Sequence, residues 1–258
     1  MGIKARRYAD ILAGAPEYVT GRQEEWKAFL ATAARNYKYP YYDQLMIYLQ
    51  RPEATACAEY DFWFDTMHRY VKRGAKGIAL VDNEGDSPKL RYVFDVADTG
   101  ARSNSRPVWL WQMKEEYRNP VMAALERAYG ISGENQSLEA QLEQVAGRLA
   151  ADYWLDYGKQ IRGIVADSFL EEYDEFNIGT VFRKAAQASI AYTLSVRCTE
   201  EGENQFEPED FRDVSDFNTR QTATALGTAV SSISREVFRE IERAIRDYER
   251  TKAQERSQ

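Results

Sequence analysis

The spacing of apolar residues changes once along this chain, and the change limits the folds that the chain can adopt. Residues 78–82 and 90–96 are short runs rich in β-branched and aromatic residues, joined by turn-forming residues 83–88, which predicts an antiparallel hairpin. Residues 107–111 are a candidate for one further strand. From Asn119 onward apolar residues recur every three or four positions, which is typical of helices. The sequence predicts an α+β fold, with a small N-terminal domain of helices and a short antiparallel hairpin or sheet before a mostly α-helical C-terminal half.

Local signals indicate where individual helices begin and end. Gly14 and Pro16 are expected to end the first helix, because proline disrupts a helix interior. Thr20 and Gln23 have the spacing of a capping box, and Ser137 is a favourable N-cap for a later helix. The expected helices cover residues 4–14, 20–33, 45–51, 60–67, 120–129, 137–153, 178–197, 217–232 and 234–250.

Charge is distributed unevenly along the 258 residues, whose net charge is −7. Residues 1–119 hold 18 Lys and Arg against 16 Asp and Glu, a balance of +2. Residues 120–258 hold 16 against 25, a balance of −9, and the two balances sum to −7. This asymmetry suggests two functional units. We place them at 1–118, a nucleic-acid-binding α+β domain, and 119–258, an acidic helical domain.

The composition argues against several classes of protein. The chain has one histidine, His68, whereas a zinc site needs about four ligands at characteristic spacings. The phosphate-binding motifs GxGxxG and GxxxxGK[ST] and the nucleophile motif GxSxG do not occur, so we expect no metal, no cofactor and no catalysis. Cys57 and Cys198 lie far apart without an export signal, so we expect reduced thiols in the cytoplasm. No apolar run is long enough to span a membrane, and an enzyme with converging carboxylates in a deep pocket is the open alternative.

Residues 35–51 interleave aromatic and basic side chains densely. The tyrosines of this segment are Tyr37, Tyr39, Tyr41, Tyr42 and Tyr48, and the cations among them are Arg35, Lys38 and Arg51. A second basic run, residues 68–76, follows. Aromatic faces interleaved with cations suit a single nucleic-acid strand, whose bases stack on rings while its phosphates meet positive charge. The alternative is that these tyrosines are core and rim residues of amphipathic helices.

Several short motifs between residues 26 and 99 occur in a familiar order. They are Trp26-Lys-Ala-Phe-Leu30, Asn36-Tyr-Lys-Tyr39, Asp43-Gln-Leu-Met-Ile47, Gln50-Arg-Pro-Glu-Ala-Thr55, Phe62-Trp63, Val71-Lys-Arg-Gly-Ala-Lys-Gly-Ile78 and Tyr92-Val-Phe-Asp-Val-Ala-Asp-Thr99. This order resembles the N-terminal domain of ArdC-type antirestriction proteins, as found at the start of large helicase-methylase proteins of integrative conjugative elements. The most specific parts are the blocks at 71–78 and 92–99.

The resemblance implies a small domain that binds single-stranded DNA without strong sequence preference and protects it during conjugation. Lys72, Arg73 and Lys76 would then contact phosphates, and Tyr37, Tyr39 and Trp63 would be candidates to stack on bases, although for Trp63 a place in the core is the favoured interpretation. The candidate nucleic-acid-binding residues are Arg35, Tyr37, Lys38, Tyr39, Tyr41, Trp63, Arg69, Lys72, Arg73 and Lys76. The family's metalloprotease-like domain carries HExxH, which this chain lacks, so that activity is not carried over.

The acidic half suggests an alternative function, as a protein-interaction module or as a DNA mimic that inhibits a host defence nuclease. The acids that could form such a surface are Glu171, Glu172, Asp174, Glu175, Glu200, Glu201, Glu203, Glu207, Glu209 and Asp210. One continuous acidic stripe would favour mimicry, and scattered acids would disfavour it. The polar C-terminal residues fit the end of a fragment of a larger protein as well as a natural end.

Overall fold

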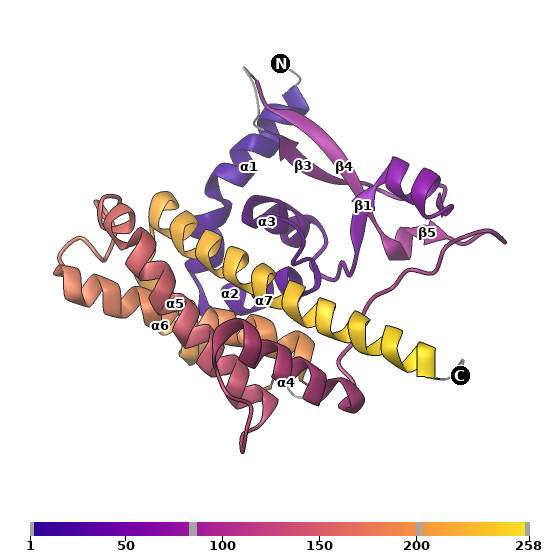
Figure 1. The fold of residues 1–258 in the computed structure, drawn as a ribbon. Helices are drawn as coiled ribbons and strands as arrows, with labels where there is room; N and C mark the ends of the chain where they lie inside the picture. Colours follow the sequence, from indigo (N-terminus) through magenta and orange to yellow (C-terminus); the bar gives the residue numbers. More distant parts are fainter. Residues whose placement is uncertain (1–2, 83–86, 200–201, 203, 256–258) are drawn as a thin grey trace.

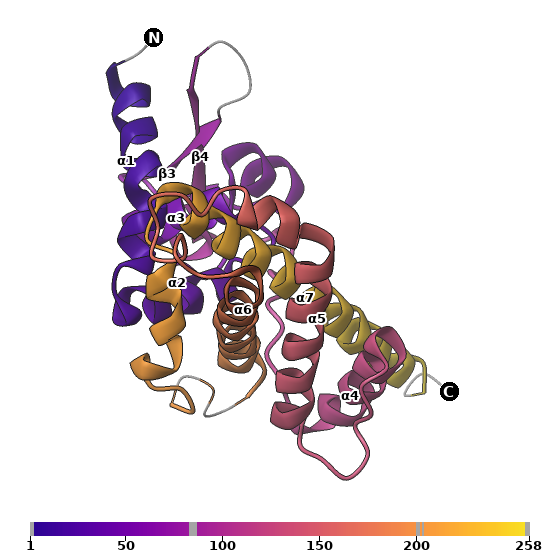
Figure 2. The same ribbon diagram turned by 90° about the vertical axis from the view of Figure 1, so that its left-hand side faces the viewer.

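A computed structural model describes residues 3–82, 87–199, 202 and 204–255. Figures 1 and 2 show a small antiparallel sheet on one side of the molecule and a layer of long helices on the other. The helices are α1 (Ile3–Thr20), α2 (Gln23–Arg35), α3 (Tyr41–Gln50), α4 (Glu115–Tyr129), α5 (Leu138–Arg162), α6 (Glu175–Cys198) and α7 (Arg220–Glu255). The shorter turns are the π-helical η1 (Phe62–Thr66) and the 3₁₀ segments η2 (Val96–Asp98) and η3 (Pro208–Asp216). The predicted α+β class is confirmed.

The strands form two small antiparallel ladders. In the first, β4 (Lys89–Asp95) lies between β1 (Cys57–Glu59) and β3 (Ile78–Asp82), and the β3–β4 register pairs Ile78 with Val93. This confirms the predicted hairpin. In the second ladder, β2 (Tyr70–Val71) pairs with β5 (Thr99–Gly100).

The segment 107–111 does not form the further strand that its sequence suggested. Its backbone is irregular, and its last residue, Trp111, is 5% exposed and packs against the rings of Tyr37 and Phe238. Packing of this one side chain into the core therefore holds the segment in place, without the ladder of backbone hydrogen bonds that a strand requires.

Several expected helix boundaries are wrong, since α3 begins at Tyr41, α4 begins at Glu115 and α5 continues to Arg162. At the end of α1 and the start of α2, tertiary packing overrides a local signal. Helix α1 continues through Gly14 and Pro16 to Thr20, with Ala15 and Val19 buried on its inner face. The Thr20 hydroxyl donates to the carbonyl oxygens of Pro16 and Phe217, so it bonds at the end of α1 and does not cap α2 as predicted. Helix α2 begins after Arg22 without a side-chain cap.

The C-terminal helices expected at 217–232 and 234–250 are one continuous helix, α7. The serines at 231 and 234 and the intervening Ile233 are all buried within it, so the polar residues around position 233 do not interrupt the helix. The signal at Ser137 is confirmed, because its hydroxyl accepts from the backbone N–H of Ala140 at 3.2 Å.

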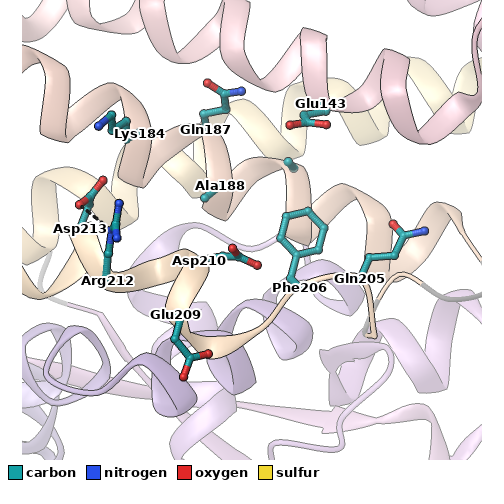
Figure 3. A pocket seen from close by; sticks show the side chains of 11 residues that line it. Glu143, Lys184, Gln187, Ala188, Gln205, Phe206, Glu209, Asp210, Arg212 and Asp213 are labelled. Carbon is teal, nitrogen blue, oxygen red and sulfur yellow. Dashed lines mark ion pairs between the residues drawn. The ribbon is translucent and has the colours of Figure 1, made fainter.

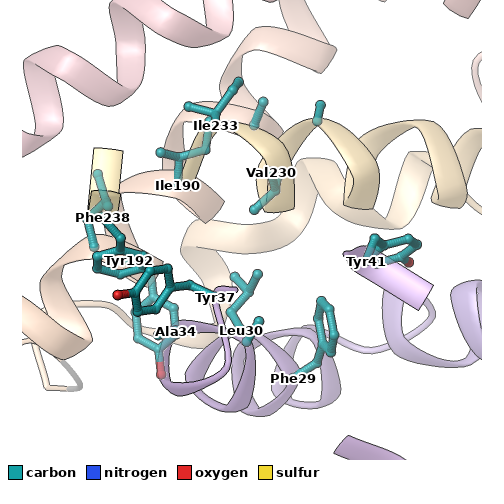
Figure 4. Close-up of a cluster of buried hydrophobic side chains, with 14 of the residues drawn as sticks. Phe29, Leu30, Ala34, Tyr37, Tyr41, Ile190, Tyr192, Val230, Ile233 and Phe238 are labelled. Carbon is teal, nitrogen blue, oxygen red and sulfur yellow. The ribbon is translucent and has the colours of Figure 1, made fainter. Parts of the chain in front are cut away.

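A single cluster of buried side chains runs through both halves of the chain. Figure 4 shows part of it, with Phe29, Leu30 and Tyr41 from the first half beside Val230 and Phe238 of α7. Helix α7 packs against α1, α3, α4, α5 and α6. The division at residue 118 is therefore not a division between two separate cores. None of the helices in the described residues is long and apolar enough to cross a membrane.

Helices α3 and α7 approach each other closely at one glycine. A Cβ atom built on Gly227 would lie 2.2 Å from the ring carbons of Tyr41, and Tyr41 is itself 3% exposed. Only a residue without a side chain fits at this crossing, because neither the ring nor the helix backbone can move away cheaply.

We expect Gly227→Ala to lower the free energy of unfolding by about 1–3 kcal/mol, since overpacking of a core contact costs that much. Gly14→Ala is the matched control: Gly14 is helical and exposed, and a Cβ there meets nothing within 4 Å. That change should raise stability by about 0.5–1 kcal/mol through helix propensity. Urea unfolding monitored by circular dichroism measures both, and equal effects of the two substitutions would contradict the packing of α3 on α7.

A buried carboxylate connects the end of α2 to α7. The hydroxyl of Tyr37 donates to Glu242 at 2.5 Å, and Lys38 and Arg246 donate to its other oxygen at 3.1 and 2.8 Å. Burial raises the pKa of Glu242, but the hydrogen bonds from Tyr37 and Lys38 outweigh it and hold the pKa below its usual value of 4.5. The ionised form is therefore the one that the fold stabilises.

Glu242→Gln should lower the free energy of unfolding at pH 7 by about 1–3 kcal/mol, because charge-assisted hydrogen bonds in a buried site are lost. The pKa is lower in the folded than in the unfolded state, so this contribution is complete above about pH 4.5 and is lost as the pH falls through the folded value. Thermal unfolding of both proteins between pH 7 and pH 3 should show the difference narrowing in acid. A difference that is constant with pH would contradict this role of Glu242.

Candidate nucleic-acid interface

The structure buries three of the aromatic residues that the sequence suggested as base-stacking groups. Tyr37 and Tyr41 are each 3% exposed and Trp63 is 2% exposed. The Trp63 indole donates to the carbonyl oxygen of Phe94 at 2.9 Å, and Tyr41 lies against Gly227. Their rings are inside the fold and present no face on which a base could stack, so for these three residues the stacking prediction is wrong.

The remaining predicted residues of this segment are half-buried or paired. The Tyr39 hydroxyl donates to the carbonyl oxygen of Cys57 at 2.9 Å, and Arg35 donates to the carbonyl oxygens of Pro52 and Ala54. The Lys38 ammonium is exposed on the surface but pairs with Glu242. Arg35, Tyr37, Lys38 and Tyr39 do lie together, because all four line a small hollow beside Arg197.

The predicted basic residues of the second run lie on the surface around β2. Lys72, Arg73 and Lys76 are exposed, and Arg69 is half-buried with its Nε donating to Thr99. The turn after β2 is closed by a hydrogen bond from the Ala75 N–H to the Lys72 carbonyl. Gly74 has a φ of +86°, a conformation that glycine adopts without strain. The turn therefore presents three cations, which we call the basic turn: Lys72, Arg73 and Lys76.

Next to the basic turn lies an exposed aromatic group that the sequence analysis did not single out. Tyr60 and Phe64 are stacked, with ring centroids 5.9 Å apart and planes at 10°. The Arg102 guanidinium lies 5.0 Å from the Phe64 centroid and 5.8 Å from that of Tyr70. We call Tyr60, Phe64, Arg102 and Tyr70 the aromatic row. Its rings are 48%, 40% and 42% exposed in the order Tyr60, Phe64 and Tyr70.

The aromatic row and the basic turn form one surface. A Cβ on Gly77, the residue after Lys76, would lie 3.1 Å from the ring of Phe94, and the Phe94 ring meets that of Tyr60 edge to face at 6.5 Å. At the other end, Tyr70 lies two residues before Lys72 of the basic turn. Its ring covers Gly100 so closely that a Cβ there would be 2.3 Å away.

Two signals in the sequence could have revealed the row. Tyr60 and Phe64 are four residues apart, a spacing that puts side chains on the same face of a helix. The neighbouring acids Asp61 and Asp65 follow each ring by one residue and therefore point elsewhere. The contributions of Tyr70 and Arg102 depend on the pairing of β2 with β5, which two-residue strands do not reveal in the sequence.

The largest groove lies elsewhere and carries charges of both signs. It has a volume of about 750 Å³ between α6 and η3, and Figure 3 shows Lys184 and Arg212 among Glu209, Asp210 and Asp213. Arg212 forms an ion pair with Asp213. Such alternation gives no uniform field for a polyanion.

The described acids that could form an acidic surface fall into two groups. The residues from Glu171 to Glu175 lie at the start of α6, whereas η3 begins beside Tyr192, which contacts Phe206 and Phe211. Seventeen residues of helix separate Glu175 from Tyr192, or about 25 Å. Glu200, Glu201 and Glu203 lie outside the described residues. Among the described acids, this separation and the ion pair of Glu175 with Arg162 disfavour DNA mimicry.

Comparison of the chain with known protein families, with curated proteins and with solved structures finds no match. The resemblance to ArdC-type domains therefore depends on its short motifs alone. The argument about function depends on the geometry of the aromatic row and the basic turn.

The described residues contain no group of three or more potential metal ligands, and both cysteines are free thiols. Cys57 is half-buried beside the hollow at Arg197, and Cys198 is buried. Burial raises the pKa of each thiol to about 12. Because the thiolate is the nucleophilic form, both are weak nucleophiles at neutral pH.

We expect neither cysteine of the native protein to be alkylated appreciably by iodoacetamide at pH 8, because the thiolate fraction stays minute four pH units below the pKa. Both should react fully in denaturant. Mass spectrometry of timed samples measures the two rates separately. Rapid modification of Cys198 in the native protein would contradict its burial.

Proposed function

We propose that this protein binds single-stranded DNA without sequence preference, through the aromatic row and the basic turn, as part of a mobile element. The proposal includes no catalysis by this chain and a place in the cytoplasm, where conjugating DNA would be met. The observation that carries it is the row itself: three exposed rings joined by a guanidinium, beside three exposed lysine and arginine side chains.

The chemistry of the row favours a single strand over a duplex. Aromatic rings stack on bases whose faces are open, and each stacked base contributes about 1–3 kcal/mol. In a duplex those faces are covered by neighbouring base pairs. Every base has a π face, so contacts of this kind tolerate any sequence.

The basic turn supplies the second part of the binding. Lys72, Arg73 and Lys76 follow Tyr70 in the chain and end next to the Phe94–Tyr60 contact, so a strand whose bases stack on the row has its phosphates near these cations. Binding that depends on phosphate neutralisation weakens with salt, by a slope of about −0.7 per phosphate contact for single strands. The resemblance of residues 71–78 to the ArdC-type motif agrees with this assignment.

Replacing Tyr60 and Phe64 by alanine should weaken the binding of a labelled oligo-dT strand by about tenfold or more, since at least one stacked base is lost. Fluorescence anisotropy at two salt concentrations measures the affinity for the oligo-dT strand and, for comparison, for the duplex that contains it. Tyr18→Ala is the matched control, because Tyr18 is 48% exposed on α1 and is not part of the row. Binding that is unchanged in the double variant would overturn the assignment to the row.

Replacing Lys72, Arg73 and Lys76 by alanine should weaken binding and make it less dependent on salt, because up to three phosphate contacts are removed. The control removes three exposed arginines of the helical half: Arg212, Arg220 and Arg239. It alters net charge equally and should affect binding much less. If both triple variants lose affinity equally, the effect is one of overall charge, and the basic turn is not the site.

A further inference from the structure

A half-buried cation lies where the two halves of the chain meet. Arg197, near the end of α6, stacks over the rings of Trp111 and Tyr37, at 4.2 and 5.2 Å from their centroids. Within the described residues, its Nη2 donates to the carbonyl oxygen of Trp111 at 3.3 Å. Its Nε is buried and has no partner among the described residues. A buried donor without a partner is unfavourable, so this guanidinium retains a free donor for a ligand.

Within the described residues, no carboxylate forms an ion pair with Arg197. The nearby Glu242 accepts from Tyr37, Lys38 and Arg246. Burial lowers the pKa of Arg197, Tyr37 and the charge of Glu242 raise it in part, and the positive charge of Arg35 lowers it. An arginine stays protonated in proteins, so Arg197 keeps its positive charge at this place.

Two adjoining hollows open onto this guanidinium, with volumes of about 110 and 260 Å³. Both are lined by Arg35, Thr55, Leu110, Trp111 and Arg197, and Lys38 lines the first. Within the described part of the chain, no Asp or Glu side chain lines either hollow. Drug-sized ligands need about 300–1,000 Å³, so the space suits a small anionic group.

The hollows are connected to the aromatic row by two short segments of chain. Strand β1 begins at Cys57, which lines the first hollow, and Tyr60 of the row follows three residues later, about 10 Å along an extended backbone. The segment that begins after β5 carries Arg102 of the row and ends at Trp111 in the hollow wall. A strand stacked on the row can therefore reach the hollow with one end.

We propose that the pocket formed by Arg197, Arg35 and Lys38 binds a phosphate monoester, namely the terminal phosphate of the strand that the aromatic row holds. This rests on the proposed function for the source of the phosphate. A planar guanidinium matches the oxygens of a phosphate with two parallel hydrogen bonds. A monoester carries about −1.5 to −2 charges and three terminal oxygens, so it gains more from clustered cations than an internal phosphodiester does.

The test compares oligo-dT strands that differ only at the end: 5′-phosphate, 3′-phosphate and hydroxyl at both ends. One phosphorylated form should bind the wild-type protein about tenfold more tightly than the hydroxyl form, the effect of one charge-assisted hydrogen bond. Arg197→Gln should remove this preference and leave binding of the hydroxyl strand nearly unchanged. Arg183→Gln, a half-buried arginine earlier on the same helix, should retain the preference.

Calorimetry with dTMP and with thymidine tests the pocket independently of the row. Binding of dTMP but not of thymidine supports the pocket, even if no strand binds and the proposed function fails. If the hydroxyl strand binds, but neither phosphate position improves affinity and dTMP gives no heat, the pocket proposal is overturned while the proposed function stands. If Arg197→Gln fails to fold, the wild-type protein still tests the pocket, because its affinities for phosphorylated and hydroxyl strands and for dTMP and thymidine can be compared.

Discussion

The packing of α7 against both halves of the chain is the constraint on which the rest of the structure depends. Its buried face includes Val237, Phe238 and Ile241, and it meets helices that lie before the sheet as well as those that follow it. The contact removes Tyr37 and Tyr41 from solvent. Because these rings belong to the core, the aromatic surface of the first half that we assign to a ligand is the one around η1 and β2.

The buried Glu242 determines how the cations near it are used. A carboxylate taken out of water is costly unless its oxygens are satisfied. Three donors satisfy it here, two from the turn after α2 and one from α7. These bonds fix the position of α7 against the end of α2. They also commit the only nearby carboxylate of the described region to partners other than Arg197. The unmatched charge at Arg197 is thus a consequence of the same network that holds the helices together.

Sequence reasoning succeeded where the deciding contacts are local. The hairpin follows from two β-rich runs around turn residues, and the Ser137 cap from a single hydroxyl three residues before its donor. It failed where a distant partner decides: Thr20 bonds to Phe217, and Tyr41 packs on Gly227. The density of tyrosines near residue 40 was informative, but it marked a junction within the core. The row and the pocket each combine segments that lie far apart in the sequence, so a local pattern could have revealed only a part of each, such as the pair Tyr60 and Phe64.

In the proposed function, the row and the pocket would recognise different parts of a nucleic acid, and this difference would give their arrangement a physical meaning. Stacking on Tyr60 and Tyr70 is tolerant of sequence and holds any stretch of a strand equally well. A pocket with two guanidinium groups can be occupied only once, by a group small and charged enough to enter it. Because β1 joins the two sites over about 10 Å, the second contact forms within a complex already held by the first, at a high effective concentration. Such an arrangement would favour the ends of strands over their interiors without reading a single base.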